Sequence, residues 1–166
     1  MALLRPAEYH RFVHSIDPAA LRARGIVGLI ADLDGTLTAW NRPEPAPEAR
    51  HWLERCVAAG LKLVIASNNG RDRVAEFAGK LGVPFLANAG KPGRNAFRRA
   101  MALLGTGPAE TAVVGDQVFT DVLGGNRMGL YTILVTPLSR QEFFGTRLVS
   151  RPLERFVLRY YGLTPR

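Results

Sequence analysis

Runs of apolar residues alternate with amphipathic stretches along this chain, and the alternation predicts strands and helices in turn. Apolar runs bounded by turn residues predict strands over residues 26–32, 61–66, 83–87, 112–115 and 130–136. The stretches between them have helical spacing, with stop signals such as Gly60 and Gly82. This order favours an α/β protein with a three-layer α/β/α, Rossmann-like fold and a central, mainly parallel five-stranded sheet.

The two ends of the chain differ from this central part, although we expect one domain over residues 1–166. An N-terminal amphipathic segment covers 1–25, the core covers 26–136, and a basic amphipathic segment covers 138–166. A last helix is predicted beyond Pro152. Its apolar residues fall on one side and its arginines on another: Leu153, Phe156, Val157 and Tyr160, and Arg151, Arg155 and Arg159. Such a helix docks on an anionic lipid surface, covers the sheet with its arginines solvated, or does both.

The charge balance is strongly positive, with 22 Lys and Arg against 14 Asp and Glu and a net charge of +8. Such a surface attracts nucleic acid, an anionic membrane or a phosphorylated substrate. Arginine richness is equally well explained by the base composition of a genome.

The cysteine content and hydropathy bear on location. Cys56 is the only cysteine, so it cannot form a disulfide within the chain, and no stretch has the order of a secretory signal. No run approaches the roughly 20 apolar residues that cross a bilayer. We therefore expect a cytoplasmic protein that can attach peripherally to the inner face of a membrane.

Two carboxylates, Asp32 and Asp34, close the first apolar run within the sequence Asp-Leu-Asp-Gly-Thr. A strand continuous in aliphatic residues belongs in the middle of a parallel sheet, and the ligands of such sheets bind beyond the carboxyl ends of the strands. A capping aspartate before a Gly-Thr turn is the simpler interpretation. Four fixed identities at this spacing favour a site instead.

Polar residues also follow the later strands. Ser67 and Asn68 follow the second strand, Lys91 follows the third, and Asp116 and Asp121 follow the fourth. Taken alone, the segment at Ser67 is compatible with an ordinary helix cap, and Lys91 is a weak signal. Four acidic groups at one sheet edge repel one another unless a cation lies among them, and an oxygen-only ligand set suits Mg²⁺. Zinc is not indicated, because Cys56 and the three histidines lack zinc-ligand spacing: His10, His14 and His51.

These motifs, each after a predicted strand, resemble the haloacid dehalogenase (HAD) superfamily of phosphotransferases over residues 26–136. A narrower resemblance, to the YqeG-type branch of subfamily IIIA, covers nearly the whole chain. It rests on the segments at 38–43, 67–69, 91–92, 96–100 and 115–127. Relatives of that branch include the mitochondrial phosphatase that converts phosphatidylglycerophosphate to phosphatidylglycerol, one step before cardiolipin. The branch carries Asn after its second Asp, where this chain has Gly35.

The resemblance implies a role for each acidic motif residue. Asp32 would be the nucleophile that forms an aspartyl-phosphate, and Asp34 would protonate the leaving alkoxide and then take a proton from water. Mg²⁺ would be held by the carboxylates of Asp32 and Asp116 and the backbone carbonyl of Asp34. Asp121 would not bind the metal itself but would orient a metal-bound water or the groups next to it.

The remaining motif residues are implied to bind phosphate. Ser67 and Lys91 would contact the transferring phosphoryl oxygens, and Lys91 would keep Asp32 ionised. Asn68 is a further phosphate-binding candidate, through its backbone. Arg42, in the loop after the nucleophile, is our candidate for the second, diester phosphate of a lipid substrate.

The spacing of the motifs indicates an open site. One helix, one strand and short loops consume the interval from Asp32 to Ser67 and again the interval from Ser67 to Lys91, so no cap domain fits in either. An uncovered site suits a phosphate presented by something large, such as a lipid in a bilayer.

We therefore expect a Mg²⁺-dependent phosphomonoester hydrolase, with phosphatidylglycerophosphate as substrate, an anionic lipid surface as partner and no nucleic acid partner. Two alternatives stay open. One is a capless phosphatase for sugar, nucleotide or nucleic-acid-end phosphates, which the basic charge permits. The other is a non-catalytic scaffold that binds RNA or a protein.

Overall fold

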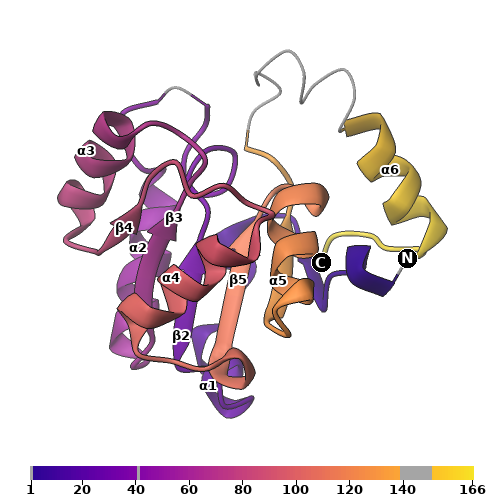
Figure 1. Ribbon diagram of the computed structural model, residues 1–166, viewed down its shortest axis with the longest axis horizontal. Helices are drawn as coiled ribbons and strands as arrows, with labels where there is room; N and C mark the ends of the chain where they lie inside the picture. The colour runs from indigo at the N-terminus through magenta and orange to yellow at the C-terminus, as the bar shows by residue number, and fades with distance from the viewer. Residues whose placement is uncertain (1, 41, 139–150) are drawn as a thin grey trace.

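The computed structural model describes residues 2–40, 42–138 and 151–166. Six parallel strands form one sheet in the order β1-β6-β5-β2-β3-β4, and helices cover both of its faces (Figure 1). The strands are β1 (Glu8–His10), β2 (Gly28–Ala31), β3 (Lys62–Ala66), β4 (Phe85–Leu86), β5 (Thr111–Gly115) and β6 (Tyr131–Val135). The helices are α1 (Pro18–Ala23), α2 (Pro47–Ala58), α3 (Arg71–Leu81), α4 (Arg94–Leu104), α5 (Leu123–Arg127) and α6 (Arg151–Tyr160). The predicted α/β/α architecture is confirmed.

The sheet has six strands where the sequence predicted five. The additional strand, β1, lies in the N-terminal segment and pairs in parallel with β6, with Tyr9 opposite Leu134. Its three residues are too few to show the alternation that identifies a strand, so only tertiary pairing reveals it. Glu8 anchors it, because its carboxylate accepts a hydrogen bond of 2.6 Å from the Tyr131 hydroxyl and lies 2.6 Å from His10 Nε2.

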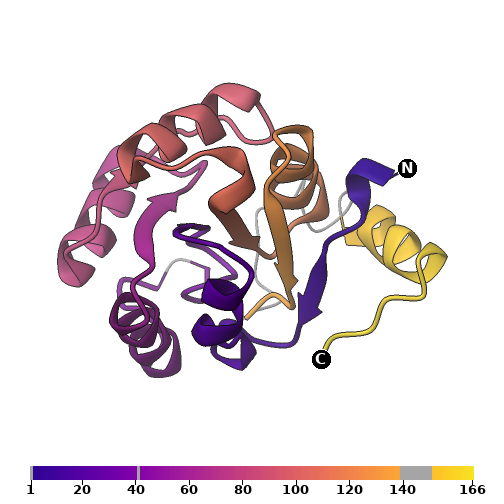
Figure 2. The same ribbon diagram turned by 90° about the horizontal axis from the view of Figure 1, so that it is seen from below.

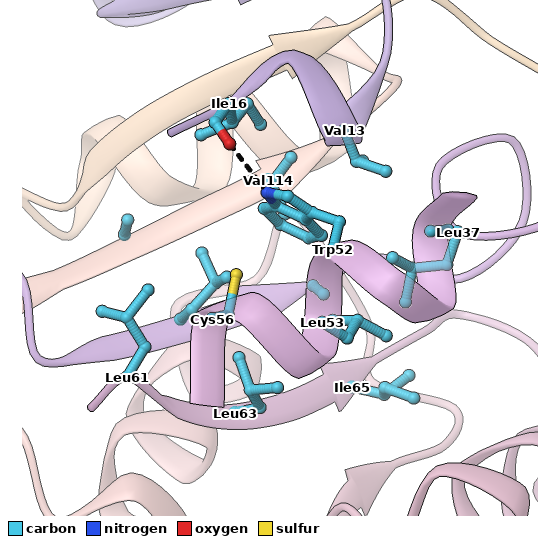
Figure 3. Close-up of a cluster of buried hydrophobic side chains, with 14 of the residues drawn as sticks. Val13, Ile16, Leu37, Trp52, Leu53, Cys56, Leu61, Leu63, Ile65 and Val114 are labelled. Carbon is cyan, nitrogen blue, oxygen red and sulfur yellow. Dashed lines mark hydrogen bonds between the residues drawn. The ribbon is translucent and has the colours of Figure 1, made fainter. Parts of the chain in front are cut away.

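The core on one face of the sheet is built around α2, whereas α4 packs on the opposite face (Figure 2). Trp52 of α2 is fully buried, and its indole Nε1 donates a hydrogen bond of 2.9 Å to the Ile16 carbonyl (Figure 3). This bond satisfies the polar atom of a large apolar side chain and ties α2 to the segment before α1. Cys56 is buried in the same cluster, and burial raises the pKa of its thiol to about 12.

The last helix, α6, lies beside the N-terminal segment at the β1 side of the sheet (Figures 1 and 2). Val157 and Glu154 are buried there, whereas Leu153, Phe156 and Tyr160 are 51%, 63% and 61% exposed. The sequence placed Val157 with these three apolar residues, but the structure turns it inward against Val118 and Leu134. The helix therefore packs on the core and also presents apolar residues outward. Within the described ranges, no helix is long and apolar enough to cross a bilayer.

Candidate active site

The candidate site lies at the carboxyl edge of the sheet. Asp32 follows β2, Ser67 follows β3, Lys91 lies in the loop after β4, and Asp116 follows β5. These four strands are neighbours and run parallel, so their carboxyl ends meet at one edge. Between Asp32 and Ser67 the described residues form α2, β3 and loops, and between Ser67 and Lys91 they form α3, β4 and loops. No cap domain is inserted in the described part of either interval.

Three carboxylates and one ammonium form the centre of this site. Oxygen atoms of Asp32, Asp116 and Asp121 all lie within 4.8 Å of one another, and all three residues are buried. Lys91 Nζ donates hydrogen bonds of 2.6 Å to Asp32 Oδ1 and 2.7 Å to Asp121 Oδ1. Three carboxylates this close together repel one another, and their oxygen atoms are ligands that suit a divalent cation such as Mg²⁺.

Burial acts on both members of the central ion pair. It raises the pKa of Asp32 to about 6, against the opposing effect of the Lys91 charge. Burial alone would lower the pKa of Lys91, but the charges and hydrogen bonds of Asp121 and Asp32 outweigh it, and the net pKa of Lys91 lies above its ordinary value. Lys91 is therefore a fixed positive charge in the site.

Gly35 keeps the space beside the acidic cluster open. Its φ of +87° is a backbone conformation that glycine adopts readily. A Cβ atom at this position would overlap the Asp116 carboxylate. The chain is thus constrained at Gly35 by conformation and by space, and a larger residue here would need Asp116 to move.

Asp121 is held by the turn that contains it. A single π-helical turn, η4 (Val118–Val122), begins after Asp116 and continues into α5. The Gln117 N–H and the Thr120 hydroxyl donate to Asp121 Oδ2 over 3.3 and 3.2 Å. The Val118 N–H donates over 2.8 Å to Glu154 Oε1, so α6 also supports this turn.

The predicted phosphate-binding residues take two different positions. Ser67 is 2% exposed at the end of β3, and its Oγ accepts a hydrogen bond of 3.1 Å from the Asn69 N–H. The Asn68 side chain is occupied by the backbone of Lys91, accepting from its N–H over 2.8 Å and donating to its carbonyl over 3.0 Å. Asn68 thus fixes the loop that presents Lys91, and a phosphate contact through the Asn68 backbone stays a prediction.

The Asp34 side chain is not part of the acidic cluster. It is bound by Asn69, from the 67–69 segment, and by Arg73, which the sequence did not single out. Arg73 Nη2 donates to Asp34 Oδ1, Arg73 Nε donates to Asp34 Oδ2 over 3.3 Å, and Asn69 Nδ2 donates to the same Oδ2. A metal contact from Asp34 would therefore come from its backbone carbonyl. Arg73 carries no sequence signal, because it is one basic residue among 22 and belongs to no motif.

Arg42 lies in the loop next to this arrangement. The residue is exposed, and its carbonyl accepts a hydrogen bond of 3.1 Å from Arg73 Nη1. Arg73 therefore bridges Asp34 and the loop that carries Arg42.

This chain is similar in sequence to known phosphatases. The HAD-hydrolase-like family model matches residues 88–137. The chain is 42% identical to the probable phosphatase YqeG of Bacillus subtilis, over 92% of this chain and 88% of that protein. It is 32% identical to the chloroplastic phosphatidylglycerophosphate phosphatase 1 of Chlamydomonas reinhardtii, over 92% of this chain but only 61% of the algal protein.

A solved structure shares the fold at low sequence identity. The cobalt-bound deoxy-D-mannose-octulosonate 8-phosphate phosphatase YrbI of Haemophilus influenzae superposes with a TM-score of 0.56 at 15% identity, over 84% of this chain and 91% of that chain. This likeness is evidence for the fold alone.

Proposed function

Because this chain belongs to the family of the YqeG phosphatase, within the HAD-like hydrolases, we propose that it is a Mg²⁺-dependent phosphomonoesterase whose substrate is phosphatidylglycerophosphate. The phosphatase activity follows from the family. The observation that carries the rest is the buried cluster of Asp32, Asp116 and Asp121 around Lys91 at the carboxyl edge of the sheet. The acyl-phosphate route, the metal and the lipid are the parts that experiment must test.

In the proposed reaction, Asp32 and Asp34 divide the chemistry between them. An Asp32 oxygen attacks phosphorus, the bond from phosphorus to the ester oxygen breaks, and the leaving alkoxide takes a proton from Asp34. Water then attacks the phosphorus of the aspartyl-phosphate and gives a proton to Asp34. Phosphate leaves, and the Asp32 carboxylate is regenerated.

The remaining residues hold charge during transfer. Lys91 and Ser67 lie at the strand ends beside Asp32 and would bind the phosphoryl oxygens. The carboxylates of Asp32 and Asp116, with the Asp34 carbonyl, would hold Mg²⁺, and Asp121 would orient the groups around it. When bound, the ion supplies positive charge that neutralises the transferring phosphoryl group.

Three observations support a lipid substrate. The algal relative is named as a phosphatidylglycerophosphate phosphatase. The described intervals between the motifs hold no cap that would enclose a small metabolite. Finally, α6 presents Leu153, Phe156 and Tyr160 outward together with Arg155 and Arg159, which are also exposed.

We propose that this face of α6 rests on an anionic bilayer, with the protein peripheral to the inner face of the membrane. Exposed apolar side chains enter the headgroup region, and each nearby cation adds about 1 kcal/mol of attraction to anionic lipid. A flotation assay with vesicles tests this: Phe156→Ser combined with Arg155→Gln should reduce binding to phosphatidylglycerol vesicles. Equal binding of the variant and the unmodified protein would contradict the docking proposal.

The deciding experiment for the function is phosphate release from phosphatidylglycerophosphate in mixed micelles. We expect turnover with Mg²⁺, none with EDTA, and a strong preference over sugar phosphates, nucleotides and nucleic-acid ends. Asp32→Asn should abolish turnover and leave the fold intact. Equal rates on all soluble esters would favour a capless phosphatase of small or nucleic-acid substrates, whereas unchanged biological activity of Asp32→Asn would favour a binding scaffold.

A second test concerns Arg42. Replacing it by Ala should lower turnover of the lipid more than turnover of an aryl phosphate, because its guanidinium is proposed to contact the diester phosphate. Equal losses on both substrates would remove Arg42 from substrate recognition.

A further inference from the structure

Arg73 forms an ion pair with Asp34, the proposed proton donor. Its guanidinium engages both carboxylate oxygens of Asp34 and donates over 3.1 Å to the Arg42 carbonyl. The Arg73 side chain is 23% exposed, whereas that of Asp34 is 9% exposed. Arg73 therefore lies on the solvent side of Asp34, at the rim of the site, and its position is fixed from two directions.

This position defines what Arg73 meets when a substrate binds. In the proposed function, Asp34 protonates the ester oxygen, so the leaving alcohol departs on the side where Asp34 lies. A guanidinium bonded to Asp34 is then about one carboxylate group away from the leaving oxygen. The part of the alcohol a few bonds beyond its ester oxygen comes within reach of Arg73.

The Arg73 guanidinium has more N–H donors than its contacts with Asp34 and Arg42 use. A guanidinium has about five N–H donors in a planar fork. The contacts with Asp34 and the Arg42 carbonyl use three of them. The other two belong to Nη1 and Nη2 and can bind a further acceptor.

The charges at this rim favour an anion. Arg73 forms its ion pair with Asp34, and Arg42, whose carbonyl Arg73 contacts, adds a second basic residue. Asp72, which precedes Arg73 in the chain, is exposed to solvent. The nearest acidic residue along the loop, Glu44, lies 2.7 Å from Lys80 Nζ. A bidentate contact with an oxyanion such as a phosphodiester is the interaction for which an arginine at such a rim is best suited.

We propose that Arg73 is a specificity-determining residue that binds an anionic group on the leaving alcohol, a few bonds from the ester oxygen. This inference rests on the proposed function and refines it: the substrate class is a phosphomonoester whose alcohol carries a second anion. Arg73 is better placed for this than Arg42, because its guanidinium is already held in position, which lowers the entropy lost on binding.

The test compares three esters with purified full-length protein in Mg²⁺. They are a short-chain phosphatidylglycerophosphate kept below its micelle concentration, glycerol phosphate and 4-nitrophenyl phosphate. The first two share a glycerol unit at the reacting phosphate, and the lipid adds a phosphodiester with its diacylglycerol. The third needs little protonation of its leaving group. Monomeric lipid keeps membrane docking out of the comparison.

For Arg73→Gln we expect the ratio of kcat/KM for the short-chain lipid to kcat/KM for glycerol phosphate to fall about 10- to 100-fold, the equivalent of one charge-assisted hydrogen bond. Arg73→Lys, which keeps the charge but not the fork, should lose part of this preference. Arg71→Gln is the matched control, since it removes the same charge from the same helix while its guanidinium lies 5.7 Å from the centre of the Phe85 ring. It should leave the ratio unchanged.

Other outcomes overturn the inference in distinguishable ways. In one outcome, Arg73→Gln slows both glycerol esters equally, so that their ratio of kcat/KM is unchanged, and does not slow the aryl ester. This would mean that Arg73 only orients Asp34. An equal loss on all three esters would mean a structural role. Failure of the unmodified protein to hydrolyse any of the three would contradict the proposed function itself.

Discussion

Replacing Lys91 by Met tests whether the acidic cluster depends on a cation. The substitution keeps the length of the side chain but removes the ammonium that lies 2.6 Å from Asp32 and 2.7 Å from Asp121. The side chains of Lys91 and Asp121 are each only 2% exposed, so water cannot replace the lost ammonium. The variant is left with buried carboxylates at Asp32 and Asp121 that have lost the Lys91 ammonium.

The expected cost is large relative to the stability of a domain. Removing one partner of a buried ion pair costs about 3–5 kcal/mol, and a whole domain is stable by about 5–15 kcal/mol. We therefore expect the free energy of unfolding of Lys91→Met in EDTA to fall by about 3–5 kcal/mol. Mg²⁺ should restore part of the loss, because the ion supplies the missing positive charge and is no longer repelled by the lysine.

Urea unfolding followed by circular dichroism, with EDTA and with saturating Mg²⁺, measures both quantities. The gain from Mg²⁺ should be greater in the variant than in the unmodified protein by at least about 1.4 kcal/mol, or tenfold in affinity. Lys62→Met is the control, because Lys62 Nζ donates to the neutral Leu104 carbonyl over 3.1 Å. Losing one ordinary hydrogen bond already costs about 1 kcal/mol. If the free energy of unfolding in EDTA fell by less than that, the reasoning would be refuted, and an equal gain from Mg²⁺ in both proteins would also refute it.

Three further predictions follow from the same structure. The pKa of Asp32 is raised from 3.8 to about 6, so its contribution to the stability of the metal-free protein should fall as pH rises from about 4 to 6 and stay constant at higher pH. Over the same interval, the rise in melting temperature caused by Mg²⁺ should grow. Equal Mg²⁺ effects at about pH 5 and pH 8 in thermal melts would contradict this. Gly35→Ala places a Cβ against the Asp116 carboxylate and should weaken Mg²⁺ binding by calorimetry about tenfold or more, whereas Gly79→Ala, at a position with open space, should leave it unchanged. Trp52→Phe removes a buried hydrogen bond to a backbone carbonyl and should lower the free energy of unfolding in urea by about 1–3 kcal/mol without changing Mg²⁺ affinity; an unchanged urea midpoint would show that the bond contributes nothing.

Local signals in the sequence were sufficient for the residues that follow strands. Asp32, Ser67, Lys91 and Asp116 each come directly after an apolar run or within a few residues of one, so the parallel arrangement alone predicts that they share an edge. The predicted strands and helices between them are found with small shifts of their ends. This agreement arises because a short stretch of sequence contains both the apolar run of a buried strand and the polar residues at its end.

The features that the sequence did not predict depend on tertiary packing. Strand β1 is recognisable only by its pairing with β6. Arg73 reaches Asp34 because α3 packs with that side toward the loop after β2, and no pattern along the chain encodes that orientation. Similarly, helical spacing grouped Val157 with Phe156, although packing separates them into a buried and an exposed residue.

The contact between Glu154 and the Val118 N–H has a practical consequence for anyone who shortens this protein. Removing the last helix to improve solubility would strip the acceptor from a buried donor, at a cost of about 1–3 kcal/mol. The loosened turn also contains Asp121. Such a truncation would therefore confound any test of lipid attachment, because weaker catalysis could come from damage at the ion site rather than from lost contact with the bilayer.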